Sequence, residues 1–425
     1  MLYHLFEWLR SEGFRFPGSS LFQFITFRVL LAVILSLLIS TLYGKKVIRL
    51  LQKYQIGESV RDLGLIGEQQ KKGTPTMGGI IIILAILIPT LLLANLTKVY
   101  IRLMIFCTIW LAIIGFIDDY LKLRSKKQAL AKGESYKKGG KDGLAGWFKV
   151  FGQVALGITV GSTLWFNTNV QTWREFIGTP TSKDAPVYSK QINGKTKYFV
   201  PTKDVVTTIP FVKNHEFNYA KLLPASVRKY AWVLYILIVI FIITAVSNGA
   251  NITDGLDGLA TGTSALIGVC LGIFAYASGN LLFADYLNIM YIPNLGELSI
   301  FIGALIGACI GFLWYNSYPA QVFMGDTGSL TLGGIIAALA IIVHKELLIP
   351  IFCGVFLVEN VSVMLQVGYF KYTRRKFGEG RRIFLMSPLH HHFQKKGYHE
   401  AKIVTRFWIV TVLCVVLAIV TLKLR

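Results

Sequence analysis

Polar residues recur every third position in the stretch from Ser247 to Ala260, at Asn248, Asn251, Asp254 and Asp257. If the stretch is helical, this spacing places two amides and two carboxylates roughly along one face. Apolar runs flank the stretch on both sides, and ionisable groups at the end of an apolar span are costly to desolvate. The pattern therefore indicates a functional site. The alternative is a polar loop that happens to be rich in Asn and Asp.

Further carboxylates end or precede other apolar runs. Asp118 and Asp119 close the run WLAIIGFIDDY, and two like charges this close disfavour both being ionised. One of the pair could accept a proton while the other holds a metal, although a solvated end of a span is the alternative. Asp326 precedes another run and could ligate magnesium, which often binds through one or two carboxylates plus substrate phosphates.

Two segments offer groups that could hold a nucleotide. The segment KKGTPTMGG brings Lys71 and Thr76 to the mouth of an apolar run, where lysine and backbone amides favour anions. The GxxxxGK[ST] order of a phosphate-binding loop is absent, so an ordinary basic loop explains this segment equally well. In WYNSYPAQVFMGDTGSL, Asn316 could hydrogen-bond a base and Phe323 could stack on one, although each residue taken singly is more often structural.

The segment SPLHHHFQKKG contains three consecutive histidines, His390, His391 and His392. They could ligate zinc, donate to phosphate oxygens or shuttle protons. Zinc is the least favoured of these, because no Cys or further His joins them at ligand spacing. Lysines, paired aspartates, a candidate magnesium ligand and a histidine cluster together are typical of phosphoryl transfer, in which catalysis is mainly positioning and charge neutralisation.

The composition predicts the elements that position these residues. Of 425 residues 54% are hydrophobic and 16% charged, whereas soluble domains average about 25% charged. We expect one all-α polytopic membrane domain over 1–425, because a span needs about 20 mostly apolar residues. The first run starts near Leu21 and is expected to be a permanent span rather than a cleaved signal peptide. About ten spans are predicted, at 21–43, 77–96, 100–120, 147–167, 231–248, 260–278, 298–316, 329–344, 347–370 and 403–423.

One connection is unusually long. The segment 168–230 is predicted to be an enlarged loop outside the membrane, on the periplasmic side. Within it VYSKQINGKTKYFV is expected to form a small β-hairpin, because Asn193-Gly194 is a strong signal for a two-residue turn. The role of this hairpin stays open.

Basic residues predict the orientation. Lys and Arg concentrate in the loops 44–75, 121–149 and 371–402, which places these loops in the cytoplasm and both termini outside. Every motif above then shares the cytoplasmic face. The formal net charge of +22 would indicate nucleic acid in a soluble protein, but here positive-inside loops and anionic ligands explain it, so nucleic acid is not an expected partner. The five cysteines lie in apolar runs at spacings that favour neither disulfides nor zinc.

The motifs KKGTPTMGG, FIDD, NITDGLDGLA, NSYPAQVFMGDTGS and PLHHHF, in this order, resemble those of the polyprenyl-phosphate sugar-1-phosphate transferases. Within that superfamily the chain looks like the bacterial phospho-N-acetylmuramoyl-pentapeptide-transferases. PLHHHF favours this branch over the N-acetylglucosamine-1-phosphate branch. The resemblance spans about residue 20 to 425, and the enlarged loop 168–230 is its main departure, which affects partners more than chemistry.

The resemblance implies transfer of phospho-N-acetylmuramoyl-pentapeptide from UDP-N-acetylmuramoyl-pentapeptide to undecaprenyl phosphate, with Mg2+ required and lipid I and UMP as products. It also implies a homodimer in the bacterial inner membrane, with membrane lipids as partners. By motif, Asp118 would deprotonate or orient the lipid phosphate beside Asp119, and Asp326 would bind magnesium. The residues expected to line the nucleotide pocket or hold uridine and diphosphate are Asn251, Asp254, Asp257, Lys71, Thr76, Asn316 and Phe323. The histidines would contact the phosphate or sugar. The predicted catalytic residues are Asp118, Asp119, Asp257, His390 and His391.

Two mechanisms and two other functions stay open at this point. The lipid phosphate could attack the β-phosphate directly, or an aspartate could first form a covalent intermediate. We favour direct attack, because a phosphate oxygen is already an adequate nucleophile. The same chemistry on UDP-N-acetylglucosamine is the nearest alternative function. A transporter is the alternative from another class, although its carboxylates would be expected at the membrane midplane rather than at one face.

Overall fold

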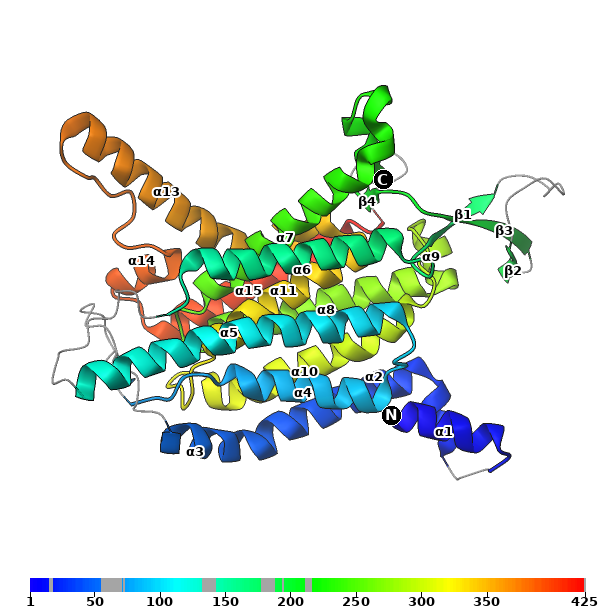
Figure 1. Cartoon of the computed structure of the whole chain (residues 1–425), viewed down its shortest axis with the longest axis horizontal. Coiled ribbons are helices and arrows are strands. Elements are labelled where there is room, and N and C mark those ends of the chain that lie inside the picture. The colour runs from blue at the N-terminus through cyan, green and yellow to red at the C-terminus, as the bar shows by residue number, and fades with distance from the viewer. Residues whose placement is uncertain are drawn as a thin grey trace.

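The computed structural model describes residues 1–14, 18–54, 71, 73–131, 143–176, 188–192, 195–210 and 216–423. In Figure 1 the long helices of this part of the chain run side by side, and the strands gather at one end of the bundle. The prediction of an all-α membrane protein with a small β element is confirmed.

The bundle is built from helices of very different length. Its helices are α1 (Leu2–Ser11), α2 (Ile25–Leu38), α3 (Gly44–Tyr54), α4 (Gly79–Leu93), α5 (Val99–Ala131), α6 (Gly146–Phe166), α7 (Ala231–Thr253), α8 (Leu259–Gly279), α9 (Leu281–Leu287), α10 (Leu298–Asn316), α11 (Gly325–Ile342), α12 (Ile349–Phe352), α13 (Gly354–Phe377), α14 (Leu389–Lys395) and α15 (Glu400–Val420). A π-helical turn (Ile39–Tyr43) joins α2 to α3. The 3-10 turns are η1 (Ser19–Gln23), η4 (Tyr219–Leu222), η5 (Ala225–Tyr230), η6 (Leu295–Glu297) and η7 (Glu346–Leu348).

Seven helices within the described residues are long and apolar enough to cross a membrane. An eighth span results if Glu346–Phe352 and Gly354–Phe377 are counted together, although the two are bent by 81° to one another. The predicted spans 77–96 and 147–167 correspond to α4 and α6. Helix α4 has only 15 residues, fewer than the about 20 that a straight span needs. The number ten therefore stays a prediction.

Helix α11 lies at the centre of the bundle, against α4, α5, α7 and α8. Glycines allow these close contacts, since a Cβ on Gly79 of α4 would lie 2.2 Å from the backbone nitrogen of Gly328. A Cβ on Gly115 of α5 would likewise lie 2.4 Å from the carbonyl oxygen of Asp326. Small residues let membrane helices approach to backbone contact. This packing brings the part of α5 that carries Asp118 and Asp119 against the first turn of α11.

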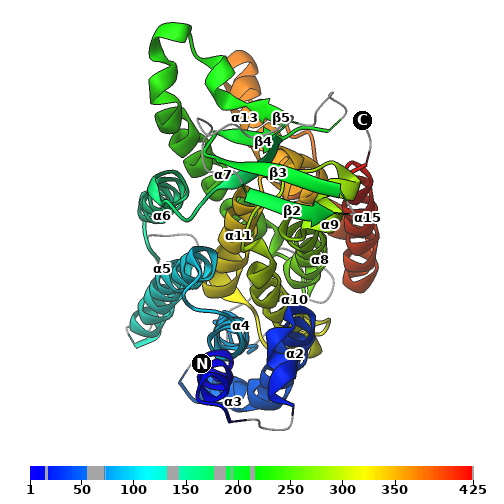
Figure 2. The same ribbon diagram turned by 90° about the vertical axis from the view of Figure 1, so that its right-hand side faces the viewer.

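The strands form two small antiparallel sheets that face the viewer in Figure 2. The first consists of β1 (Thr172–Phe176), β3 (Lys195–Thr202) and β2 (Tyr188–Ile192) in that order, and the second of β4 (Val206–Thr208) and β5 (Glu216–Asn218). Strands β2 and β3 pair in a register that sets Ile192 opposite Lys195. This confirms both strands of the predicted hairpin, while its turn at Asn193-Gly194 lies outside the described residues.

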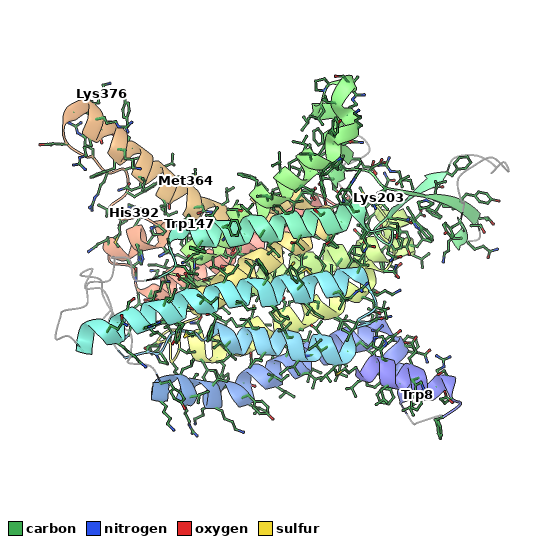
Figure 3. All side chains as sticks on the ribbon, viewed as in Figure 1. Trp8, Trp147, Lys203, Met364, Lys376 and His392 are labelled. Atoms are coloured by element: carbon green, nitrogen blue, oxygen red, sulfur yellow. The ribbon has the colours of Figure 1, made fainter. Side chains whose placement is uncertain are left out.

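The two ends of the bundle differ in their polar residues. We call the end that holds Asp118 and Asp326 the carboxylate end, and the end that holds Arg28 and Glu297 the opposite end. In Figure 3 the labelled Trp147 and His392 lie toward the carboxylate end, whereas Lys203 and Trp8 lie toward the opposite end. Helix α13 diverges from the bundle and α14 returns the chain to the carboxylate end (Figure 1). The predicted motifs therefore gather at one end of the helices.

Candidate active site

Three carboxylates converge where α5 meets α11. One ligand oxygen each of Asp118, Asp119 and Asp326 lies within 4.8 Å of the others. Asp118 and Asp119 are almost fully buried, and Asp326 is partly exposed. The convergence depends on Gly325, whose φ of +72° is strained for other residues and whose Cβ would lie 2.6 Å from Asp119 Oδ2. The structure thus brings together the acidic pair and the candidate magnesium ligand that the sequence predicts.

Two lysines lie among these carboxylates. Lys122 Nζ is 2.6 Å from Asp118 Oδ2 and 3.1 Å from Asp326 Oδ2. Lys149, on the first turn of α6, pairs with the same two oxygens, at 2.8 Å from Asp118 Oδ2. The sequence interpretation treated both lysines only as basic loop residues. The spacing of Lys122, one helical turn after Asp118, is the signal that could have indicated its role.

Asp119 has a different role from Asp118. Its Oδ1 accepts a hydrogen bond from the backbone of Asp326 at 3.1 Å. Its Oδ2 accepts from the backbone and the hydroxyl of Thr327, at 2.9 and 2.6 Å. A carboxylate that accepts the free N–H groups of a helix N-terminus stabilises that terminus. Asp119 therefore fixes the first turn of α11 and with it the position of Asp326.

The stretch from Ser247 to Ala260 is not one continuous helix, so its four polar residues do not share a single helical face. Helix α7 ends at Thr253 and α8 begins at Leu259, with a turn between them. Asn251, on α7, donates from Nδ2 to Asp326 Oδ1 at 3.0 Å and to Ser329 at 2.8 Å. The turn carries Asp254 and Asp257, and Asp257 points into a second polar cluster.

This second cluster consists of Lys71, Asp257 and Glu400. Lys71 Nζ lies 2.7 Å from Asp257 Oδ1 and 2.6 Å from Glu400 Oε1. Asp257 Oδ2 also accepts the backbone N–H of Ala320 at 3.0 Å. Burial disfavours the charge of Lys71, but the neighbouring Glu400 and Asp257 carboxylates outweigh it and raise the pKa of the ammonium above its ordinary value. The sequence interpretation missed Glu400, the first residue of α15.

Asn316 has its amide committed to the protein. It is buried, accepts from the Gly258 backbone at 3.1 Å and from Thr261 at 3.0 Å, and donates to the Val322 carbonyl at 2.9 Å. Asn316 therefore holds the turn before α8 against the segment before α11. Phe323 is partly exposed in that segment, and its backbone pairs with the chain near Thr76, donating to Pro75 and accepting from Gly78 at 2.8 Å each.

The three histidines occupy three different environments. His390 is fully buried, with Nδ1 3.1 Å from Glu359 Oε2 and Nε2 so close to Gly255 that a Cβ there would lie 2.2 Å away. His391 bonds Gln394 at 2.6 Å, and burial together with the neighbouring His390 lowers its pKa to about 4. His392 accepts the backbone N–H of Leu385 at 3.1 Å. His390 thus supports the turn that carries Asp254 and Asp257.

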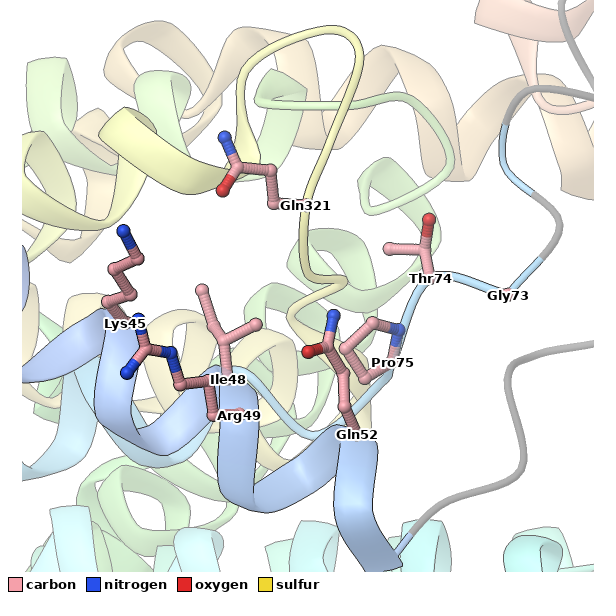
Figure 4. Close-up of a pocket in the computed structure, with 8 residues that line it drawn as sticks. All are labelled: Lys45, Ile48, Arg49, Gln52, Gly73, Thr74, Pro75 and Gln321. Atoms are coloured by element: carbon pink, nitrogen blue, oxygen red, sulfur yellow. The ribbon is translucent and has the colours of Figure 1, made fainter.

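A separate open pocket adjoins this region. It has a volume of about 390 Å³ and lies between α3 and the segment around Thr74 (Figure 4). Its lining residues are Lys45, Ile48, Arg49, Gln52, Gly73, Thr74, Pro75 and Gln321. Two of these lining residues adjoin Ala320, whose backbone N–H bonds Asp257: Gln321 follows it in the chain, and Thr74 donates to its carbonyl at 3.4 Å. The pocket contains neither Asp257 nor Asp326, so it is not the acidic site itself.

Comparison with known sequences first defines the class of protein. The profile of glycosyl transferase family 4 matches residues 184–344, and signature 1 of phospho-N-acetylmuramoyl-pentapeptide-transferase matches residues 71–83. The matched segments contain Lys71, the turn before α8 and Asp326. The bundle and its polar end are therefore those of a membrane-embedded glycosyl transferase.

Full-length relatives narrow this class to one family. The phospho-N-acetylmuramoyl-pentapeptide-transferases of Flavobacterium psychrophilum and Flavobacterium johnsoniae are 60% and 58% identical to this chain, and that of Parabacteroides distasonis is 54% identical. Each alignment covers 100% of both chains. The chain belongs to the phospho-N-acetylmuramoyl-pentapeptide-transferase family.

Proposed function

We infer that the protein transfers phospho-N-acetylmuramoyl-pentapeptide from its UDP carrier to a polyprenyl phosphate, which we propose to be undecaprenyl phosphate. The products are lipid I and UMP, in the first membrane step of peptidoglycan synthesis. The observation that carries this function is the cluster of Asp118, Asp119 and Asp326 with two lysines at the end of apolar helices. Phosphoryl transfer depends mainly on positioning and charge neutralisation, and this cluster provides both beside the membrane.

Magnesium is the proposed cofactor, with Asp326 as its ligand. The residues present fit this ion, because the converging donors are carboxylate oxygens and magnesium prefers oxygen ligands. Two ammonium groups already lie between Asp118 and Asp326, which marks this space as favourable for positive charge. When bound there, magnesium would supply neutralisation of the negative charge on the substrate diphosphate.

The chain's own residues support direct transfer. In this reaction a lipid phosphate oxygen forms a bond to the β-phosphorus, the bond from that phosphorus to the bridging oxygen breaks, and UMP leaves. Lys122 and Lys149 can stabilise the charge on the transferred group. Asp118 accepts from the Leu144 backbone at 2.7 Å and faces both lysines, so it is held in place to orient the acceptor phosphate or take its proton. A phosphosugar trapped on Asp118 or Asp257 would contradict direct transfer.

The Lys71 cluster is proposed to hold the uridine end. Two carboxylates surround the single ammonium there, whereas the first cluster offers two lysines and the proposed magnesium, so the diphosphate is expected at the first cluster. A neutral base with several hydrogen-bonding groups suits it better, with Phe323 as a stacking surface. The segment from Ala320 to Asp326 connects the two clusters, which allows one nucleotide sugar to reach both.

The protein is a multi-pass membrane protein, and we propose the following placement. The site faces the cytoplasm of the bacterial inner membrane, because the loops around it are the basic ones. Figure 1 shows both termini on the side of the molecule away from α14, in accord with termini outside. The homodimer stays a prediction from the resemblance. The full-length relatives favour the muramoyl-pentapeptide donor over UDP-N-acetylglucosamine and over a transporter.

Release of UMP by detergent-purified protein tests this function. The assay contains undecaprenyl phosphate and UDP-N-acetylmuramoyl-pentapeptide, with and without magnesium, and UDP-N-acetylglucosamine serves as the comparison donor. We expect release that requires the lipid, magnesium and the muramoyl-pentapeptide donor. UMP release only with UDP-N-acetylglucosamine would show that this nucleotide sugar is the donor. Movement of a substrate across the membrane without UMP release would indicate a transporter.

A further inference from the structure

We propose that Glu400 is a positioning residue of the donor site: it holds Lys71 and the turn of Asp257 in the arrangement that receives the nucleoside. This proposal rests on the function proposed above and adds a residue to which neither the motifs nor the resemblance assigns a role. Glu400 lies at the first position of α15, far along the chain from both of its partners. It connects three segments that are separate in sequence.

The contacts of Glu400 all pass through one oxygen. Its Oε1 accepts from Lys71 Nζ at 2.6 Å and from the backbone N–H of Asp257 at 2.7 Å. Lys71 in turn donates to Asp257 Oδ1 at 2.7 Å. The three groups therefore close a ring in which the Lys71 ammonium is fixed from two sides. Since an unrestrained lysine side chain has four rotatable bonds, this ring removes most of the freedom that substrate binding would otherwise have to remove.

The other oxygen of Glu400 argues against a purely structural role. Oε2 is buried and accepts no hydrogen bond from any residue that the structure describes. A buried carboxylate with one oxygen unpaired is costly, and a neutral side chain of similar shape would commonly stabilise a fold as well or better. A glutamine could keep the acceptor bonds of Oε1 without the cost of the charge. The negative charge is therefore retained for its effect on Lys71.

That effect is electrostatic and geometric. If Asp257 were its only partner, the Lys71 ammonium would be paired with a single carboxylate and could turn toward the diphosphate of the donor. With Glu400 beside it, the ammonium stays directed at the Asp257 turn, and the diphosphate is left to Lys122 and Lys149 at the other cluster. Glu400 thereby helps to fix which end of the donor enters which cluster.

The experiment compares Glu400→Gln, Glu400→Asp and Glu400→Ala with Glu379→Gln, which removes the same charge from an exposed position. Affinity for UDP-N-acetylmuramoyl-pentapeptide is measured by calorimetry without lipid acceptor, and kcat, KM and the unfolding temperature are measured in parallel. For Glu400→Gln we expect Kd and KM of the donor to rise about tenfold, as for loss of one charge-assisted contact. We expect kcat to stay within about twofold and the unfolding temperature not to fall.

The controls separate positioning from stability. Glu400→Asp keeps the charge and should recover part of the affinity, and Glu379→Gln should match the wild type. In a Lys71→Met background, Glu400→Gln should change Kd less than about twofold, since its effect passes through Lys71. Unchanged donor affinity in Glu400→Gln, or affinity lost only in step with the unfolding temperature, would overturn the proposal. Absence of UMP release by the wild type would instead overturn the proposed function, because the calorimetry needs no turnover.

Discussion

The two ends of the bundle handle buried charge in opposite ways. At the opposite end Arg28 meets Glu297 through two bonds, at 2.8 and 2.5 Å, and donates a further bond to the Leu93 carbonyl at 3.1 Å. Glu297 also accepts the Asn95 backbone N–H at 3.1 Å. One cation is matched to one anion, and their remaining bonds go to the backbone. Such a pair ties α2 to the end of α4 and to η6, the turn before α10, and its two charges are matched to each other.

The carboxylate end is built with an imbalance. Asp118, Asp119 and Asp326 face two ammonium groups, and Asp257 and Glu400 face one. Each cluster therefore has more negative than positive charge, and the lysines are shared rather than paired. An excess of carboxylate in a buried site is costly unless a cation compensates it. The comparison indicates that the matched Arg28–Glu297 pair stabilises the fold, whereas the unmatched carboxylates around Asp326 and Asp257 are available for a ligand.

Removal of the Asp326 carboxylate is the strongest test of this difference between the two ends. We expect Asp326→Asn to lower kcat by at least about a thousandfold, because it removes the proposed metal ligand and a partner of both lysines. UMP release over a magnesium titration measures the effect. Asp285→Asn, at the opposite end, removes a carboxylate that pairs with Lys197 and should leave kcat unchanged. Equal loss in both variants would show that the carboxylate end has no special role.

Glu297→Gln tests the claim that the opposite end serves stability alone. The variant leaves Arg28 buried without its counter-charge, which we expect to lower the free energy of unfolding by about 3 kcal/mol. Donor KM of the remaining folded enzyme should not change. The double variant Arg28→Met with Glu297→Met should recover most of the stability, because removing both charges leaves none unpaired. A change in KM without a change in stability would refute the division between the two ends.

The sequence predicted the carboxylate end well for a physical reason. Asp118, Asp119 and Asp326 stand out because charged residues at the ends of apolar runs are rare and need an explanation. The positive-inside rule then predicts, without any knowledge of packing, that their loops lie on one side of the membrane. The β2 and β3 strands were likewise visible from local turn chemistry.

The rest depended on tertiary contacts that no local pattern encodes. Lys149 and Glu400 resemble ordinary residues at helix starts, and only the fold shows which carboxylate or ammonium each one meets. In the sequence, an asparagine such as Asn316 cannot be assigned to a nucleotide base or to the protein backbone as the partner of its amide. The break between α7 and α8 was predictable in part, as the gap between the predicted spans 231–248 and 260–278, although α7 continues to Thr253.

Lys149→Met sharpens the comparison within the carboxylate end. Its ammonium contacts both Asp118 and Asp326, so the variant removes charge from the position where the transferred group is expected to carry its negative charge. We expect kcat to fall about a hundredfold, with a smaller change in donor affinity. Steady-state kinetics separate the two, and Lys221→Met, at an exposed lysine outside the cluster, is the matched control. A rise in Kd with kcat preserved would assign Lys149 to ground-state binding instead.

The smallest predicted effect concerns Lys345, at the opposite end of the bundle. Its side chain is buried and donates to Thr208 at 2.7 Å. Burial lowers the pKa of its ammonium from 10.5 to about 8, although the nearby Glu346 and Glu216 carboxylates act to raise it. Between these two values the unfolded chain binds more protons than the folded one, so stability should rise as the pH rises through this window. Relative to Lys345→Met, we expect the wild type to gain about 2 kcal/mol of unfolding free energy between pH 8 and about 9.5. Parallel pH profiles of unfolding for the two proteins would contradict this, and kcat at pH 8 should be the same in both, because the charge lies outside the catalytic end.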